Sequence, residues 1–263
     1  MKLALIQTNL IWENPKENLS AFDKQLENIS SDTEIVILPE VFATGFTMDI
    51  EKFGNSIGKE AFEWMQQKAK VLNKVIVGSL LIKESGNYYN RLYWVRPDGI
   101  YKYYDKRHLF QMGDEHKVMT AGNKRIVVEH KGVKFMLQTC YDLRFPSFMR
   151  NKYDKHTNAH DYDVLLFVAN WPEVRKKVYN TLLRARAIEN QTYVVWVNRV
   201  GEDGHKVVFS GDSQIVDPFG NVSEQMPAHI EGILYSEIDI SKLQDFRKNY
   251  KVGLDWDEFD IKE

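Results

Sequence analysis

Two kinds of segment alternate along the whole chain. Short runs rich in β-branched and aromatic residues predict strands, and longer segments with an apolar residue at every third or fourth position predict amphipathic helices. Strands and helices that alternate in this way pack in layers, with the helices covering the sheets. The expected strands are residues 2–8, 34–38, 75–82, 90–95, 134–139, 164–168, 193–197 and 207–216, and the expected helices are residues 15–29, 59–72 and 176–191.

Turn-forming residues separate several of these strands and predict hairpins. Because a hairpin joins antiparallel strands, a purely parallel sheet is disfavoured, and a pair of mixed sheets covered by helices fits better. No linker, repeat or low-complexity segment divides the chain, so we predict a single domain over residues 1–263. The turn signals are residues 85–87, 96–99, 202–204 and 217–221.

Composition excludes several classes of protein. A hydrophobic content of 43% and a formal net charge of −2 are typical of a globular chain without the basic bias of a nucleic-acid-binding protein. No apolar run approaches the roughly 20 residues of a membrane span, and the amino-terminal run predicts a strand, not a signal peptide. We therefore expect neither a nucleic acid nor a membrane as partner.

Two charged segments carry no recognisable motif. Residues 151–156 are expected to form a solvated loop. Residues 243–263 mix aromatic and charged side chains, and exposed aromatic residues there would favour packing of this tail against a partner subunit.

Cys140 is the only cysteine, so no intramolecular disulfide can form, which suits a reducing cytoplasm. It follows the expected strand 134–139 and precedes a turn, at the carboxyl end of a strand where α/β folds place their chemistry. This position predicts a nucleophile, although a lone cysteine more often serves as an inert core residue. No cysteine or histidine cluster accompanies it, so neither a metal nor dithiol chemistry is expected.

Three further residues could serve the thiol. Glu40 follows an apolar strand and precedes an aromatic loop, where desolvation would disfavour its charged form and make it a base near neutral pH. Lys106 lies in a segment of cations and rings, and a lysine fixed near a thiol stabilises a thiolate and an oxyanion. Glu115 is a second candidate acid. Each of the three could equally be a solvated surface residue.

Together these segments resemble the nitrilase superfamily of carbon-nitrogen hydrolases. The resemblance implies a four-layer αββα sandwich that commonly pairs into dimers, so a homodimer or a higher homo-oligomer is expected. It rests on LPE at residues 38–40, DKRHLF at 105–110, CYDLRFP at 140–146, NWP at 170–172, RARAIEN at 184–190 and GDS at 211–213.

The same resemblance implies a role for each candidate residue. Glu40 would act as the general base, Cys140 as the nucleophile and Lys106 as the stabiliser of the oxyanion, helped by the backbone N–H of Tyr141. Glu115 matches the second glutamate of the family, which helps to place the lysine or the substrate. An amide would lose ammonia to give a thioester, which water would then hydrolyse, with no metal or organic cofactor.

Within the superfamily, residues 40–48 and 170–175 look most like the active-site loops of the omega-amidase group. That group hydrolyses the terminal amide of 2-oxoglutaramate and 2-oxosuccinamate, whose far end carries a carboxylate. Arg175 is the candidate partner for this carboxylate, or else a structural arginine at a helix start. Arg144 is expected to hold its turn through a buried ion pair. The expected pocket walls, or alternatively core residues, are Phe42, Phe46, Tyr141 and Trp171.

The motifs leave other functions open. An aliphatic nitrilase or an N-carbamoyl amino acid hydrolase would use the same three catalytic residues. A catalytically silent fold, kept for protein interaction or thiol sensing, is the non-enzymatic alternative.

Overall fold

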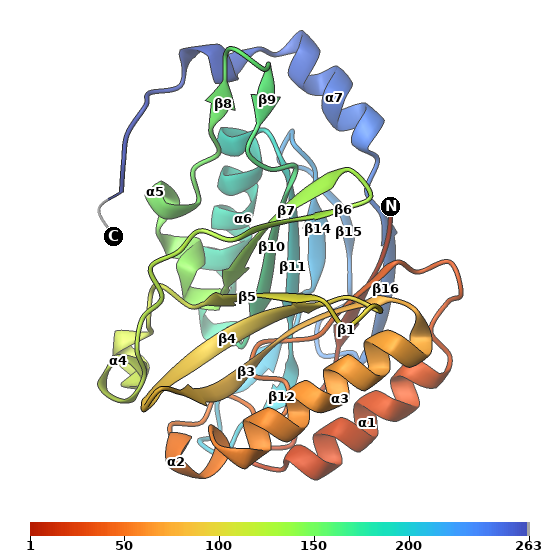
Figure 1. Cartoon of the computed structure of the whole chain (residues 1–263), viewed down its shortest axis with the longest axis vertical. Coiled ribbons are helices and arrows are strands. Elements are labelled where there is room, and N and C mark those ends of the chain that lie inside the picture. The colour runs from red at the N-terminus through yellow and green to blue at the C-terminus, as the bar shows by residue number, and fades with distance from the viewer. Residues whose placement is uncertain (262–263) are drawn as a thin grey trace.

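Two six-stranded sheets face each other, and helices cover the outer face of each sheet (Figure 1). The computed structural model describes residues 1–261. Its four layers, helix, sheet, sheet and helix, confirm the predicted αββα sandwich of mixed sheets.

The first sheet has the order β16-β1-β2-β3-β4-β5. Its three central strands, β1, β2 and β3, run parallel, and the outer strands pair with them in antiparallel fashion. Its strands are β1 (Lys2–Gln7), β2 (Ile35–Ile37), β3 (Val75–Glu84), β4 (Asn87–Val95), β5 (Tyr101–Asp105) and β16 (Gly232–Glu237).

The second sheet repeats this plan with the order β15-β14-β11-β10-β7-β6. Strands β7, β10 and β11 are parallel, and antiparallel strands flank them. Its strands are β6 (Val127–His130), β7 (Val133–Thr139), β10 (Val164–Ala169), β11 (Tyr193–Asn198), β14 (Gln214–Val216) and β15 (Val222–Gln225). Two small ribbons pair β8 (Tyr153–Asp154) with β9 (Ala159–His160), and β12 (Val200–Glu202) with β13 (Val208–Ser210).

Three long helices supply the outer layers. Helices α1 and α3 cover the first sheet, and α6 covers the second (Figure 1). The helices are α1 (Pro15–Glu27), α2 (Ile50–Phe53), α3 (Ser56–Leu72), α4 (Glu115–Val118), α5 (Pro146–Met149), α6 (Lys176–Asn190) and α7 (Ile240–Asn249), with short 3-10 turns η1 (Gln111–Gly113), η2 (Cys140–Arg144), η3 (Glu173–Arg175) and η4 (Val252–Asp255).

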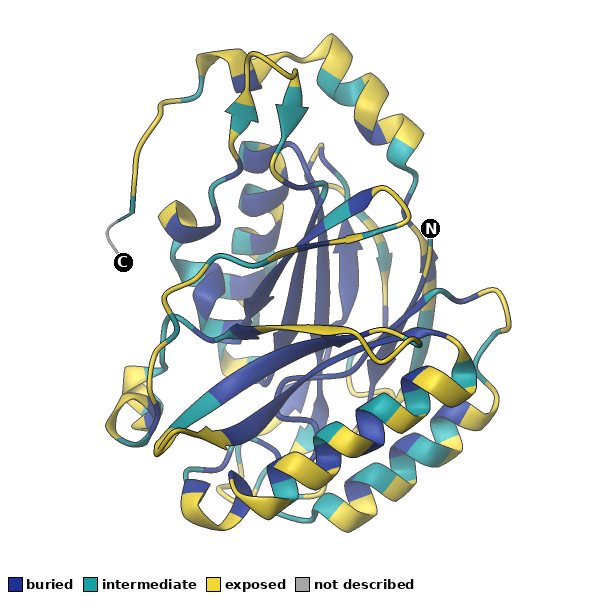
Figure 2. Cartoon of the chain, viewed as in Figure 1, coloured by how far each residue is buried: buried dark blue, intermediate teal, exposed yellow. Residues whose placement is uncertain are grey.

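Apolar side chains fill the space between each pair of layers. The central core lies between the sheets and joins Leu5 and Val77 of the first to Leu137 and Leu166 of the second. Separate cores lie beneath α1 and α3, and beneath α6. Figure 2 shows the result: the central strands are buried, whereas edge strands such as β5 and the outer faces of the helices are largely exposed. None of the helices within residues 1–261 combines the length and hydrophobicity needed to cross a membrane.

Most predicted elements are present, and all four turn signals form hairpins. One predicted strand, residues 207–216, is wrong as a single element, because it divides into β13 and β14. Between them Gly211 and Asp212 have φ angles of +77° and +58°, which bend the chain out of the extended conformation. The prediction missed β5, β6, β15 and β16, which are the edge strands of the two large sheets and carry polar residues, and it also missed the short strands β8, β9 and β12.

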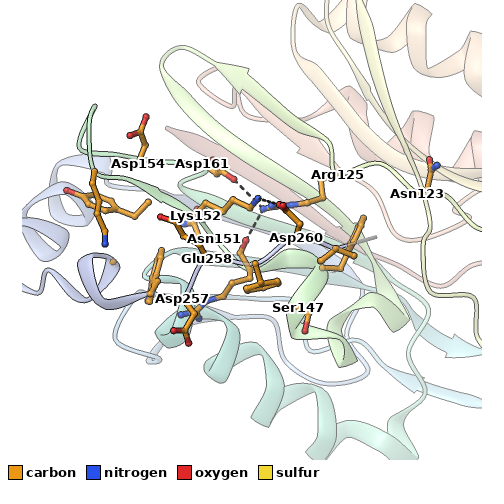
Figure 3. A pocket seen from close by; sticks show the side chains of 18 residues that line it. Asn123, Arg125, Ser147, Asn151, Lys152, Asp154, Asp161, Asp257, Glu258 and Asp260 are labelled. Atoms are coloured by element: carbon orange, nitrogen blue, oxygen red, sulfur yellow. Dashed lines mark hydrogen bonds and ion pairs between the residues drawn. The ribbon is translucent and has the colours of Figure 1, made fainter. Parts of the chain in front are cut away.

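The segment expected to be a solvated loop forms one wall of a surface cavity of about 590 Å³. Residues 151–155 face the chain segment 256–261 across it (Figure 3). Lys152 Nζ lies 3.9 Å from an oxygen of Asp260, and Arg125 lies 3.5 Å from Asp161. The predicted carboxyl-terminal tail therefore packs against its own chain here, while its last two positions, 262 and 263, lie outside the described residues.

Replacing Leu166 tests the core between the sheets. We expect Leu166→Ala to lower the free energy of unfolding by about 2–5 kcal/mol, because a buried leucine leaves a cavity between rigid sheets. The measurement is urea-induced unfolding. Val71→Ala, at a position that is 72% exposed on α3, is the control and should change stability by less than about 0.5 kcal/mol. Equal effects at both positions would contradict this account of the core.

Candidate active site

The residues predicted to carry the chemistry meet where strands of both sheets end. Glu40 follows β2, Lys106 follows β5 directly, and Cys140 follows β7. Glu115 opens α4 in the next loop, and Asn170 follows β10. The loops that join the strands are thus brought together although they are far apart in the sequence.

A buried ammonium group lies between two buried carboxylates. Lys106 Nζ is 2.8 Å from Glu40 Oε1 and 2.9 Å from Glu115 Oε2. All three side chains are at most 1% exposed. Glu115 Oε2 also accepts a 2.6 Å hydrogen bond from the backbone N–H of Phe110, so this oxygen is held by both the ammonium and the main chain. Such an arrangement is stable only because each charge has a partner.

The surroundings shift the pKa values of these groups in predictable directions. Burial alone would lower the pKa of Lys106, but the charges of Glu115 and Glu40 outweigh it, so the pKa is raised and the lysine stays an ammonium. Burial raises the pKa of Glu115, and the charge of Glu40 adds to this effect, while Lys106 opposes it. The cluster therefore holds one fixed positive charge between two buried carboxylates.

Cys140 begins the turn η2 with a left-handed φ of +42°. This conformation costs free energy in a residue other than glycine and turns the chain sharply at the end of β7. The thiol is 8% exposed at the floor of a cavity. Burial raises its pKa well above the usual range, and the charge of Glu40 raises it further, while Lys106 lowers it. The resting cysteine is therefore a thiol that needs a base.

Asp142 ties the nucleophile turn to the loop that carries the lysine. Its carboxylate accepts hydrogen bonds from Tyr104 Oη at 2.8 Å and from the backbone N–H of His108 at 2.9 Å. It also accepts one from the backbone N–H of Thr139, just before the cysteine. His108 Nδ1 lies 2.8 Å from the same carboxylate. The relative position of Cys140 and the lysine loop therefore depends on this one buried carboxylate.

The predicted role of Arg144 is wrong. It was expected to hold its turn through a buried ion pair, yet no acid pairs with it among residues 1–261, and it lies over the rings of Tyr141 and Trp171 at the cavity. Arg186 of α6 holds the turn instead, because its Nε and Nη2 donate to the carbonyl oxygen of Leu143 at 3.1 and 2.8 Å.

A cavity of about 500 Å³ opens above Cys140. Phe46, Tyr141, Trp171 and Arg175 line it, as the sequence predicts. Phe42 does not line it. This residue is fully buried beneath the first sheet, with its ring centre 5.4 Å from that of Phe22 and 5.7 Å from that of Trp64. Its assignment to the pocket is therefore wrong, and it is a core residue, which was the alternative. The other lining residues include Lys106, Phe110, Arg144, Asp203, His205 and Phe209.

Two asparagines complete the site and were not predicted. The backbone N–H of Asn170 donates to Glu40 Oε2 at 2.7 Å, and its side chain donates to the Glu40 carbonyl oxygen. Asn90 of β4 donates to Glu40 and Glu115. For Asn90 one weak signal was present, because asparagine is uncommon within strands. Within residues 1–261 no group of three histidine, cysteine or acidic residues could hold a metal ion.

Comparison with known proteins gives consistent relatives. The family model for carbon-nitrogen hydrolase matches residues 2–248. Omega-amidase YafV from Escherichia coli K12 is 40% identical over 260 residues, which cover 98% of each chain. The 2-oxoglutaramate amidase of Bacillus subtilis 168 is 33% identical over 253 residues, or 95% of each chain.

Solved structures agree with these relatives. XC1258 from Xanthomonas campestris, a CN-hydrolase superfamily protein with an arsenic adduct in its active site, superposes with a TM-score of 0.96. It is 39% identical, and the match covers 100% of this chain and 99% of that one. Nit3 of Saccharomyces cerevisiae, a member of the nitrilase superfamily, shares the fold with a TM-score of 0.81 at 23% identity, over 95% and 93% of the two chains.

Glu40→Gln should separate ionisation of the thiol from transfer of its proton. Because the charge of Glu40 raises the pKa of Cys140, its removal should lower the midpoint of thiolate formation, measured by absorbance near 240 nm against a Cys140→Ser background. If Glu40 is the general base, as the sequence predicts, hydrolysis of an amide should nevertheless fall by about 100-fold or more. A midpoint that stays the same or rises in Glu40→Gln would contradict the electrostatic account.

Proposed function

Because the chain belongs to the carbon-nitrogen hydrolase family and is a hydrolase that acts on amides, we propose that its substrates are small omega-amido 2-oxo acids. Examples are 2-oxoglutaramate and 2-oxosuccinamate, which would yield a dicarboxylate and ammonia. The observation that carries the proposal is a pair of guanidinium groups, Arg144 and Arg175, at the cavity above Cys140. The names of the relatives from Escherichia coli and Bacillus subtilis support the same substrate class.

The two arginines make one end of the cavity an anion site. Neither forms an ion pair with a carboxylate in the part of the chain that the structure describes, and Arg175 lies 5.2 Å from the ring centre of Phe110. Burial lowers the pKa of Arg175, and the neighbouring charge of Arg144 lowers it further, so an arriving anion would relieve their repulsion. A planar guanidinium matches a carboxylate through two parallel hydrogen bonds.

The cavity also suits the length and charge of these substrates. Phe46, Tyr141 and Trp171 line the same cavity as the two arginines and Cys140, and these ring walls favour a short linear chain. Two cations would repel the 2-ammonium group of an amino acid amide such as glutamine, whereas a 2-oxo group can accept hydrogen bonds from them. The proposed specificity therefore follows from charge as well as size.

Formation of the thioester begins at Glu40. Its carboxylate takes the proton of the Cys140 thiol, and the sulfur attacks the amide carbonyl carbon. The ammonium of Lys106 and the backbone N–H of Tyr141 stabilise the oxygen that becomes negative. Glu40 then gives its proton to the amide nitrogen, the carbon-nitrogen bond breaks, and ammonia leaves a thioester.

Hydrolysis of the thioester reuses the same base. Glu40 takes a proton from a water molecule, whose oxygen attacks the thioester carbon. The second tetrahedral intermediate carries its negative charge at the position of the first, next to Lys106. When the carbon-sulfur bond breaks, Cys140 regains a proton and the carboxylic acid product is released.

We also propose that the enzyme acts in the cytoplasm as a homodimer. Its one cysteine is unpaired and buried, which suits a reducing compartment. Tyr250, Leu254 and Phe259 of the predicted tail are exposed, and a partner subunit could cover them. The single-domain organisation of residues 1–263 stays a prediction.

Ammonia release tests the substrate class. Purified enzyme should release ammonia from 2-oxoglutaramate faster than from glutamine, an aliphatic nitrile or an N-carbamoyl amino acid, and Cys140→Ala should abolish the release. Turnover of only one of the other compounds would overturn the proposed substrate and keep the nucleophile. No turnover of any of them by the folded enzyme would favour the non-enzymatic alternative.

Neutralising either arginine tests the anion site. Arg144→Gln and Arg175→Gln should each raise KM for 2-oxoglutaramate by about 10- to 100-fold, because each loses a charged hydrogen bond, while kcat changes less. For butyramide, which has no carboxylate, kcat/KM should change less than about threefold. Arg96→Gln is the control, since this exposed arginine pairs with Asp98 in a distant hairpin. Equal losses on both amides would contradict a role in carboxylate binding.

A further inference from the structure

One amide side chain touches both carboxylates of the buried cluster. Asn90 Nδ2 lies 2.8 Å from Glu40 Oε1 and 3.1 Å from Glu115 Oε1. Its backbone carbonyl accepts a 2.9 Å hydrogen bond from the backbone N–H of Lys106. We propose that Asn90 is a positioning residue that sets the acid limit of catalysis by stabilising negative charge on the Glu40–Glu115 pair.

The orientation of this amide is determined by the carboxylates. Asn90 is fully buried, and its Oδ1 has no hydrogen-bond partner within residues 1–261. An unpaired buried acceptor is unfavourable, and a native protein rarely tolerates one. Turning the amide over would place that oxygen against two negatively charged groups, which is worse. The N–H groups of the Asn90 amide therefore face the glutamates, and its oxygen is left without a hydrogen-bond partner.

A neutral donor does something here that a second cation would not. Lys106 already supplies a full positive charge to both carboxylates. Another cation would hold Glu40 as a carboxylate so firmly that it could no longer accept a proton from the thiol or from water. An amide stabilises the charged form more gently and adds direction, because its two N–H bonds point to two separate acceptors.

Few other ionisable groups act on this cluster. Lys106 after β5, Glu115 at the start of α4, Glu40 after β2 and Cys140 at η2 all face it. Arg91, the next residue along β4, points to the opposite side of the strand, where it pairs with Asp105 and Glu84. Arg175 at the cavity also interacts with the charge of Cys140, so these side chains and the Asn90 amide form the charged surroundings of the site.

The inference rests on the proposed catalytic roles of Glu40 and Cys140 but not on the identity of the substrate. The test measures kcat/KM against pH for wild-type enzyme and Asn90→Leu, with whichever linear amide the wild type hydrolyses fastest. Asn90→Leu loses the hydrogen bonds to both Glu40 and Glu115, which disfavours their carboxylate forms. The acidic limb of the kcat/KM profile should therefore move to higher pH by about one unit. If the proposed substrate class is wrong, a different amide will be the fastest substrate of the wild-type enzyme. If the proposed role of Asn90 is wrong, the acidic limb of the pH profile will not move.

Two further variants keep the result decisive. If Asn90→Leu does not fold, Asn90→Ser replaces it, because the shorter serine side chain cannot donate to both Glu40 and Glu115. The acidic limb of its pH profile should move in the same direction. Asn190→Ser is the matched control, because Asn190 is also fully buried but donates to the carbonyl of Arg186 at the end of α6. Its acidic limb should stay in place. An unmoved limb in a folded Asn90 variant, or an equal movement in Asn190→Ser, would overturn the proposal.

Discussion

The buried contact of Lys106 with Glu40 and Glu115 is the interaction on which the rest of the site depends. Removing one partner from a buried ion pair leaves an uncompensated charge, at a cost of about 3–5 kcal/mol, so the three side chains require one another. They come from the loop after β2, the end of β5 and the start of α4. The cluster can form only if these segments end within a few ångströms of one another, and that condition constrains the first sheet.

The second sheet must then be placed with the same accuracy. Cys140 belongs to it, and hydrogen bonds within residues 1–261 help to bring the thiol to the cluster. Asp142 joins the nucleophile turn to the loop after β5, and Asn170 joins the loop after β10 to Glu40. The apolar core between the sheets sets their separation but gives no direction to any side chain. Packing therefore sets the distance between the sheets, and directional hydrogen bonds from buried polar groups set the orientation of the site residues.

Much of this architecture could be predicted from the sequence because its central strands are buried on both faces. Strands β2 and β10 consist of buried apolar residues that contrast clearly with their surroundings. Edge strands do not give that contrast. In β15 the sequence VSEQ alternates between half-buried and exposed positions, and it reads as a polar loop until its pairing with β14 is known. Pairing between distant segments is information that local patterns do not contain.

The same distinction between local patterns and distant contacts applies to the residues of the site. Glu40, Lys106 and Cys140 could be identified because each lies in a motif, whereas Asn90 is a single residue in a strand and acquires its meaning only from two distant carboxylates. Phe42 was misplaced because the chain turns immediately before it.

That turn has a functional consequence. Val41 has a φ of +40° and Cys140 a φ of +42°, so a residue in the left-handed conformation stands directly after the proposed base, Glu40, and another at the proposed nucleophile. Neither is a glycine, and each such conformation costs about 1–3 kcal/mol. At Val41 the bend is fixed by a 2.8 Å hydrogen bond from its N–H to Ser79 Oγ. The bend ends the strand direction, so that Glu40 faces the cluster while Phe42 enters the core. Backbone strain at these two positions thus lets the ends of two sheets present the proposed base and the thiol to the same point.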